Sequence, residues 1–210
     1  MDLLKGFSHL HHASIKFQGD KTIYVDPFKI AGAPHDADFV FCTHEHFDHL
    51  SPEDIRKVMK EGTVAVVPKE NVKSCRKLDL KEVIGVEAGK DYEIAGLKFK
   101  VVPSYNLDKK FHKRKEDFLG FIITIGGADY YFAGDTDYIP EMETIKADVV
   151  FLPVGGTYTM NATEAARAAN TIKPKVAVPI HFGSVVGTRA DAETFLAHLD
   201  QGIQGVILLP

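Results

Sequence analysis

Residues 41–50 read FCTHEHFDHL and place three histidines and two acidic residues within six positions. The apolar run at 37–43, which leads into them, predicts a buried strand. After them, Ser51 suits a helix cap, Pro52 the first helical position and Gly62 the end of the helix. The metal-capable side chains therefore lie where a strand passes into a helix, a place where rigid elements hold functional loops.

The spacing of these side chains suits metal ions. His44 and His46 are two residues apart, so in an extended segment their rings point the same way. Asp48 and His49 come where the chain turns into the helix, and they can face a second point. Because neutral imidazole and carboxylate are ligands of zinc and similar divalent ions, one stretch can supply two neighbouring ions. A further carboxylate, such as Asp135, can bridge them.

Two other apolar runs end in the same kind of residue. Asp135 follows YYFAG, and His181 follows VAVPI. Since ligand sites in open sheets lie beyond the strand ends, we expect both residues to join the site. A single histidine at a strand end is usually an ordinary polar or core residue, so the expectation for His181 depends on the cluster at 44–49.

The rest of the chain alternates short strands and helices. Pairs of strands separated by turn residues predict hairpins at 13–17 with 21–26, 91–94 with 97–103, and 119–125 with 129–135. Further strands are expected at 63–68, 147–156, 174–183 and 205–210. Helices are expected at 51–62, 161–172 and 191–200, the second with a capping box of Asn161 and Glu164. We find no linker or repeat and expect a single domain over 1–210.

Composition limits the function classes. The chain has 45% hydrophobic residues, a formal net charge of -4 and a pI of about 6.2, which argues against a nucleic-acid binder with a global basic field. Cys42 and Cys75 are too few for a disulfide framework. The N-terminus lacks a basic segment followed by a long apolar one, and no apolar run is long enough to span a membrane. We expect a cytoplasmic protein with a small-molecule substrate and no membrane or nucleic-acid partner.

Several motifs carry a family resemblance. The THEHFDH stretch matches the His-x-His-x-Asp-His signature of the metallo-β-lactamase superfamily. FAGDTD at 132–137 resembles the superfamily's bridging-aspartate segment, and PIHFG at 179–183 resembles its final histidine. With LHHAS, VDPF, PSYN and FLPVGGTYTM, the chain resembles over nearly its whole length a branch of metal-dependent hydrolases related to ascorbate-6-phosphate lactonase.

The resemblance implies a fold and a ligand set. The fold class is α/β (α+β), a four-layer αββα sandwich of two mixed sheets with helices outside and the metals at one edge. The implied cofactors are two divalent metal ions, with zinc expected and manganese, iron or nickel also able to accept these ligands. The first metal is held by His44 and His46, the second by Asp48, His49 and His181, and Asp135 bridges the two.

One departure from the family pattern concerns the first metal. Most hydrolytic members have another histidine before the bridging aspartate, but here Asn106 follows the strand at 97–103. An amide oxygen is a weaker zinc ligand than imidazole. We expect Asn106 at the ligand position, as a weak ligand or beside a weakened site, with His112 lining the mouth. Alternatively the loop folds back and His112 completes the site, or His112 is a solvated loop residue.

Four other residues have suggested roles. Asp26 suits a partner that fixes a ligand imidazole through its second nitrogen, although a turn residue before Pro27 would look the same. By family analogy His12 lies near the metals and orients substrate or a ligand. Also by resemblance, Thr157 and Tyr158 border the pocket as hydrogen-bond donors, while the start of a helix explains them equally.

These observations predict a hydrolase. A metal-activated water would attack a small ester, lactone or phosphoester, with Asp48 orienting the water and Asp135 required for both metals. Residues 109–115 carry five cations, which form either a solvated face or a lid that favours an anionic substrate. The chain has no Gly-x-Ser-x-Gly nucleophile motif. The alternative is a non-catalytic metal-binding or sensing protein of the same fold, which the Asn106 departure keeps open.

Overall fold

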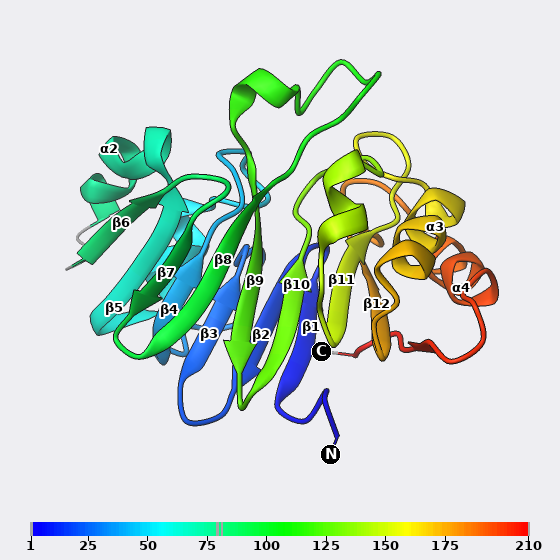
Figure 1. Ribbon diagram of the computed structural model, residues 1–210. Helices are drawn as coiled ribbons and strands as arrows, with labels where there is room; N and C mark the ends of the chain where they lie inside the picture. Colours follow the sequence, from blue (N-terminus) through cyan, green and yellow to red (C-terminus); the bar gives the residue numbers. More distant parts are fainter. Residues whose placement is uncertain (1, 79, 81, 210) are drawn as a thin grey trace. The chain divides into compact units, whose positions relative to one another are not determined.

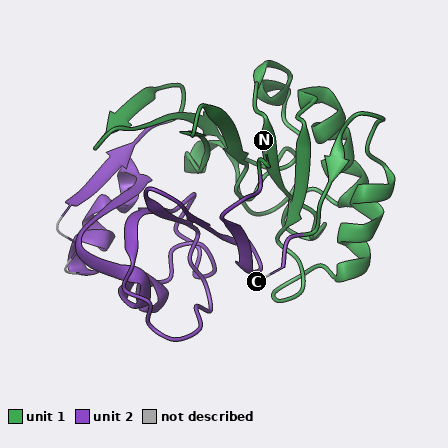
Figure 2. Ribbon diagram, turned by 90° about the horizontal axis from the view of Figure 1, so that it is seen from below, with its two compact units in different colours: residues 1–3, 88–207 green, residues 4–87, 208–210 purple. Residues whose placement is uncertain are grey.

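The computed structural model describes residues 2–78, 80 and 82–209 of the chain. By its internal contacts the chain divides into two compact units, coloured separately in Figure 2. Unit 1 comprises residues 1–3 and 88–207, and unit 2 comprises residues 4–87 and 208–210. Each unit contains one complete β-sheet and its own helices.

The sheet of unit 2 has six strands that follow one another in chain order. The strands are β1 (Phe7–His11), β2 (Ser14–Gln18), β3 (Thr22–Val25), β4 (Ala37–Phe41), β5 (Met59–Pro68) and β6 (Glu82–Val86). The first three pair antiparallel, which confirms the first predicted hairpin, and β3 to β6 pair parallel. Parallel pairing brings the carboxyl ends of β3 and β4 to the same edge of this sheet.

Helix α1 (Pro52–Val58) begins as predicted, with the Ser51 hydroxyl accepting from the Asp54 N–H. Its predicted end at Gly62 is wrong, because the chain becomes extended at Met59 and pairs there with β4. The sheet pairing therefore overrides the helical pattern of these residues. Helix α2 (Val72–Cys75) and strand β6 were not expected from the sequence.

Buried apolar side chains fix α1 and α2 on the unit 2 sheet. Ile55 and Val58 of α1 and Cys75 of α2 belong to one core cluster with Val40 of β4 and Ala65 of β5. Burying a side chain of valine or isoleucine size contributes about 1.5–3 kcal/mol, so this cluster holds the strand ends in place. The loop after β4 is thereby attached to a rigid support.

The sheet of unit 1 has seven strands in the order β13-β12-β11-β10-β9-β8-β7. They are β7 (Asp91–Ile94), β8 (Leu97–Pro103), β9 (Leu119–Ile125), β10 (Ala128–Phe132), β11 (Val149–Pro153), β12 (Val176–Ile180) and β13 (Gln204–Gly205). Strands β7 to β10 pair antiparallel, which confirms the other two predicted hairpins, and β10 to β13 pair parallel.

The last predicted strand, 205–210, is wrong in extent, and its last residue, Pro210, lies outside the described residues. In the part of the chain that the structure describes, β13 pairs with β12 at Gln204 and Gly205 alone, and residues 208 and 209 belong to unit 2. There the Leu209 carbonyl accepts a hydrogen bond from the His9 N–H at 3.4 Å.

Helices α3 (Ala162–Ile172) and α4 (Arg189–Ala197) lie beside β11 and β12 (Figure 1). The capping box of Asn161 and Glu164 at the start of α3 forms as predicted. The buried alanine face of α3 packs in one core cluster with strand residues such as Val150 and Leu152. Among the described residues, no helix has the length and apolar character needed to span a bilayer.

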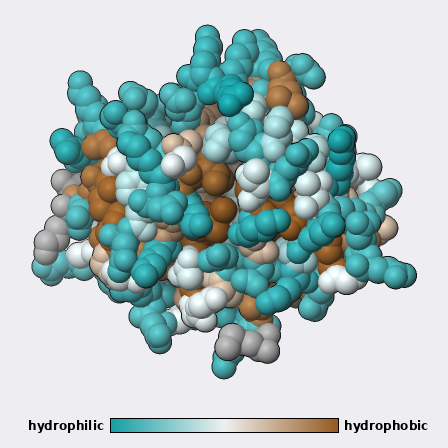
Figure 3. Space-filling view, viewed as in Figure 1, coloured by the Kyte–Doolittle hydropathy of each residue, from teal (hydrophilic) through white to brown (hydrophobic). Residues whose placement is uncertain are grey.

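The β8–β9 loop, residues 104–118, extends beyond the end of the unit 1 sheet (Figure 1). Its base is closed by the Ser104 N–H, which donates to the Phe118 carbonyl at 2.9 Å. Leu107 and Phe111 are exposed, and hydrophobic side chains are visible near the loop tip among hydrophilic ones (Figure 3). A defined base and a polar, partly apolar tip make this loop a candidate part of a binding surface.

Candidate functional site

In unit 2, the candidate ligands gather around one carboxylate at the ends of β3 and β4. Asp26 follows β3, and its Oδ1 accepts from the Thr43 N–H at 2.8 Å. Its Oδ2 lies 2.8 Å from the Thr43 hydroxyl and 2.7 Å from His49 Nδ1. The structure therefore places Asp26 on the ring of a candidate ligand histidine, the arrangement expected of a residue that orients it.

The same network sets the hydrogen positions of two imidazoles. A carboxylate only accepts, so His49 donates from Nδ1 to Asp26 and keeps a lone pair on Nε2. The Thr43 hydroxyl gives its hydrogen to Asp26 and can accept from His44 Nδ1, 3.0 Å away. His44 then also carries its lone pair on Nε2. Sequence reasoning missed Thr43, because no pattern marks a threonine before the histidines.

His44 and His46 present nitrogens to one another. His44 Nε2 lies 3.1 Å from His46 Nδ1. Two nitrogen ligands of a tetrahedral zinc ion, each at about 2.0–2.1 Å from the metal, are about 3.3 Å apart. The two side chains are therefore spaced as two ligands of one divalent cation would be.

Asp48 lies between two histidines of unit 2. Its Oδ2 is 3.4 Å from His12 Nε2 and 3.7 Å from His49 Nε2. The His12 turn is held by His9, whose Nε2 lies 2.6 Å from the His12 carbonyl. Burial lowers the pKa of His9, so it is a neutral donor in this contact. The structure thus brings His12 to Asp48, one of the candidate ligands.

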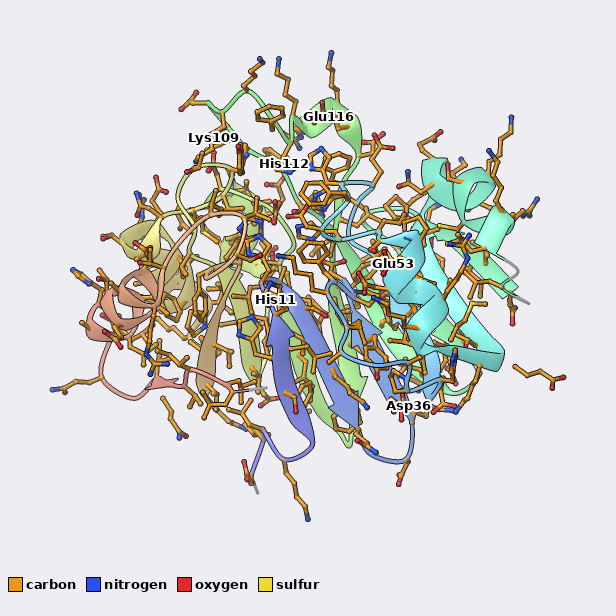
Figure 4. All side chains as sticks on the ribbon, turned by 180° about the vertical axis from the view of Figure 1, so that it is seen from behind. His11, Asp36, Glu53, Lys109, His112 and Glu116 are labelled. Atoms are coloured by element: carbon orange, nitrogen blue, oxygen red, sulfur yellow. The ribbon has the colours of Figure 1, made fainter. Side chains whose placement is uncertain are left out.

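In unit 1, three candidate ligands come from three different loops. Asp135 follows β10, His181 follows β12, and His112 belongs to the β8–β9 loop. Asp135 Oδ2 lies 3.1 Å from His181 Nε2 and 3.4 Å from His112 Nε2. His112 is buried at the base of its loop, whereas Glu116 is exposed at the surface (Figure 4).

Asn106 holds the loop that carries His112. Its backbone N–H donates to the His112 carbonyl at 2.6 Å. Its side-chain Nδ2 donates to the carbonyls of Phe111, at 3.0 Å, and Tyr158, at 2.6 Å. The structure thus brings His112 to Asp135 and turns the Asn106 amide nitrogen toward backbone carbonyls. This arrangement favours the alternative in which the loop folds back and His112 completes the site, with Asn106 beside it.

Gly155 makes room for His181. A Cβ atom at position 155 would lie 2.7 Å from the His181 carbonyl oxygen and 3.0 Å from His181 Nδ1. Any side chain there would therefore displace the histidine or its backbone. The sequence predicted position 155 as part of the strand expected at 147–156, and the close approach to His181 could not be read from it.

Tyr158 contributes its backbone carbonyl to the surroundings of His112, and Thr157 lies at the surface. The Tyr158 carbonyl lies 3.2 Å from His112 Nδ1. Its ring packs edge-on against Phe111, with centroids 5.5 Å apart. Thr157 is exposed, and its backbone N–H donates to the Gly155 carbonyl at 3.0 Å.

The five cations at 109–115 divide into two groups. Lys109 pairs with Asp137, and Arg114 Nη2 lies 3.0 Å from Glu141 Oε1. The remaining three are exposed, and among them Lys110 lies over the Phe111 ring at 5.6 Å. The paired residues fasten the loop to unit 1, and an anion would be met by the exposed ones: Lys110, Lys113 and Lys115.

Backbone conformation also marks these residues. Nine non-glycine residues have positive φ in the part of the chain that the structure describes. Four of them are candidate site residues, at φ values of 53° for His12, 49° for Asp26, 60° for His112 and 60° for His181. Side chains rarely adopt this conformation, and such residues concentrate at functional sites. The backbone therefore points to the same residues as the side-chain contacts.

Comparisons with known proteins agree with this geometry. Residues 7–181 match the model of the β-lactamase superfamily domain. A UPF0173 metal-dependent hydrolase of Thermoplasma acidophilum is 32% identical, covering 89% of this chain and 87% of its own. A protein of the same family name from Pyrococcus horikoshii is also 32% identical, covering 96% and 95%.

Solved structures share the fold. A protein from Parabacteroides distasonis, provisionally named a metal-dependent hydrolase, has a TM-score of 0.80 and 34% identity, covering 97% of this chain and 93% of its own. CmlA, a diiron β-hydroxylase from Streptomyces venezuelae, has a TM-score of 0.79 but only 17% identity, covering 97% and 52%, and shows the fold alone. The expected fold class is confirmed, and the chain belongs to the β-lactamase superfamily and, within it, to the UPF0173 family of metal-dependent hydrolases.

Proposed function

We propose that the chain is a hydrolase that depends on divalent metal ions and acts on small ester, lactone or phosphoester substrates. The names of its relatives support the reaction type. The observation that carries the proposal is the Asp26 network, which leaves the lone pairs of His44 and His49 on Nε2. Metal-ligating histidines almost always donate their other ring nitrogen to a carboxylate, a backbone carbonyl or a water, and the Asp26 network provides this arrangement.

The proposed ligands come from both clusters. Unit 2 contributes His44, His46, Asp48 and His49, and unit 1 contributes His112, Asp135 and His181. We propose two ions, with zinc favoured by the imidazole-rich set and manganese, iron or nickel also compatible. Bound metal would lower the pKa of a water toward neutrality and polarise the substrate.

The chain itself would position the water and move its proton. Asp48 is the proposed acceptor for the proton of the attacking water, since carboxylates serve as general bases. His12 Nε2, 3.4 Å from Asp48 Oδ2, would hold this carboxylate in one orientation. Asp135 would keep the rings of His112 and His181 together in unit 1.

An anionic substrate is the more specific part of the proposal. Its support is a group of exposed cations in the β8–β9 loop, namely Lys110, Lys113 and Lys115. Lys109 and Arg114 of the same loop form ion pairs that attach the loop to the rest of unit 1. A phosphorylated small molecule would suit them. We also propose a cytoplasmic location, because both thiols, Cys42 and Cys75, are buried and unpaired with one another.

Elemental analysis of protein purified without chelator tests the proposal together with a hydrolysis screen. We expect two ions in the wild type, fewer in His112→Ala, and turnover of at least one lactone, ester or phosphodiester. Equal metal content in both proteins would remove His112 from the ligands. Bound metal without turnover of any substrate class would favour the alternative, a metal-binding or sensing protein.

A further inference from the structure

Asn106 lies three residues beyond β8, and its side chain is buried. Both hydrogens of its amide nitrogen are used, one on the Phe111 carbonyl at 3.0 Å and one on the Tyr158 carbonyl at 2.6 Å. A flipped amide would place an oxygen 2.6 Å from a carbonyl oxygen, so these contacts fix its orientation. Asn106 Oδ1 is buried without a hydrogen-bond partner among the described residues.

The hydrogen bonds of the Asn106 amide determine which nitrogen of the His112 ring carries the hydrogen. His112 Nδ1 lies 3.3 Å from Asn106 Nδ2 and 3.2 Å from the Tyr158 carbonyl. Asn106 has no third hydrogen to give, so an unprotonated Nδ1 would face a nitrogen with both hydrogens committed. A protonated Nδ1 instead donates to the Tyr158 carbonyl, whose second lone pair accepts it. The lone pair of His112 is then on Nε2, the atom 3.4 Å from Asp135.

Asn106 also holds the backbone of His112. Its N–H donates to the His112 carbonyl at 2.6 Å, and it forms an isolated parallel bridge with Lys113. His112 has a φ of 60°, a conformation that costs free energy and needs support from its surroundings. Asn106 thus supports the strained backbone of His112 and also lies beside the His112 ring.

We propose that Asn106 is a positioning residue that selects the Nδ1–H tautomer of His112 and holds its ring toward Asp135. Asn106 then acts through His112 and the Tyr158 carbonyl, and a ligand histidine directly after β8 is unnecessary. The metal-binding consequence depends on the proposed function, whereas the tautomer is a property of the metal-free protein.

The first experiment uses the metal-free wild type. Long-range ¹H–¹⁵N correlation spectra distinguish the two neutral tautomers, and the His112 signals are assigned by their absence in His112→Ala. We expect the hydrogen of the neutral ring on Nδ1. A hydrogen on Nε2 overturns the proposal without reference to any variant of Asn106 or to activity.

The second experiment compares Asn106→Leu with a matched control, Asn170→Leu. Asn170 also donates its amide to a backbone carbonyl, that of His198 at 3.0 Å, but lies in α3. Leucine has about the size of asparagine but neither donates nor accepts, so the Tyr158 carbonyl loses the donor that holds it beside His112. We expect Asn106→Leu to lose the Nδ1–H preference and to bind Zn²⁺ about 10–100-fold more weakly, with the control unchanged. Trypsin should also cut the β8–β9 loop of Asn106→Leu several-fold faster, since two hydrogen bonds of the loop are lost.

The outcomes separate the two proposals. Wild-type tautomer and wild-type Zn²⁺ affinity in a folded Asn106→Leu protein overturn the positioning role. A wild type that binds no Zn²⁺ overturns the proposed function but leaves the tautomer measurement standing. Should Asn106→Leu fail to fold, Asn106→Ser, which keeps one donor, gives the same two readouts with a smaller expected loss of affinity.

Discussion

The two units assemble their candidate ligands differently. In unit 2, His44, His46, Asp48 and His49 lie within one short stretch, and the Asp26 carboxylate orients the rings through direct and threonine-mediated contacts. In unit 1, the candidate ligands come from three separate loops. There a backbone carbonyl and a glycine do the positioning that a carboxylate does in unit 2.

This difference predicts which kind of substitution disturbs each cluster most. A carboxylate gives a strong, charge-assisted contact, so unit 2 depends on a few polar side chains. In unit 1 the positions of backbone carbonyls and the close contact between Gly155 and His181 depend on loop conformation. The unit 1 cluster is therefore sensitive to side-chain volume and to changes in its loops. Substitutions of each kind, made in each unit, test the contrast.

The largest effect is expected for Asp135→Ala, which removes the carboxylate that faces both histidines of unit 1. Metal content should fall, and hydrolysis should drop by more than about 10³-fold, since several kcal/mol of metal-dependent stabilisation would be lost. Asp129→Asn, at the start of β10, is the control. Full activity in Asp135→Ala would show that unit 1 does not supply an essential ligand carboxylate.

The second prediction concerns the carboxylate of unit 2. Asp26→Asn should weaken binding of Zn²⁺ by about 10–100-fold, because the ring of His49 loses its charged acceptor. Asp38→Asn is the control, since Asp38 also accepts a backbone N–H but from Thr22, away from the histidines. Dialysis against a competing chelator measures the affinity, and equal affinities for Asp26→Asn and the wild type would remove the contrast between the units.

The third prediction tests volume in unit 1. Gly155→Ala adds a Cβ within 3.0 Å of both the backbone oxygen and the ring of His181. We expect a loss of about tenfold in metal affinity, because the ring must move away from Asp135. Thr157→Ala, an exposed change in the same loop, serves as control and should behave like the wild type. A Gly155→Ala protein that binds metal normally would mean that His181 tolerates displacement.

The smallest effect is expected at Asp54, a second carboxylate that organises unit 2. Burial would raise its pKa, but hydrogen bonds from Ser51, the Ile30 N–H, Lys57 and the Lys29 N–H outweigh burial and lower the pKa below 3.8. A lowered folded-state pKa stabilises the protein above the unfolded value, and the contribution is lost as pH falls through the folded value.

Asp54→Asn should therefore unfold about 1 kcal/mol more easily at neutral pH. The difference from the wild type should shrink below pH 3.8, as the wild-type carboxyl is itself protonated. Denaturant titrations at a series of pH values measure it. A difference independent of pH would show that Asp54 acts through shape and not through its charge.

Patterns local to the chain predicted most of the fold and the unit 2 cluster. Apolar runs and turn residues marked the hairpins and most strands, and a short signature marked the residues from His44 to His49. The end of α1 was wrong because pairing with β4, which the local pattern does not contain, extends β5 back to Met59.

Unit 1 was harder to predict because its ligands meet only after folding. Asn106 stands where a histidine was expected, and the sequence alone does not show that the loop returns His112 toward Asp135. The closeness of Gly155 to His181 could not be predicted either, since it arises from two loops far apart in the chain. The Tyr158 carbonyl that contacts His112 could not be predicted, because every residue has a backbone carbonyl and the sequence does not mark the one that is used.

The positive φ values of His12, Asp26, His112 and His181 have a consequence for protein engineering. Glycine adopts this conformation without the steric cost that a Cβ brings, about 1 kcal/mol per residue. A redesign guided by backbone conformation alone would therefore choose glycine at all four positions. Each such change would relieve the backbone but delete a buried side chain that the site is built from, so backbone strain is a misleading guide to which residues can be replaced here.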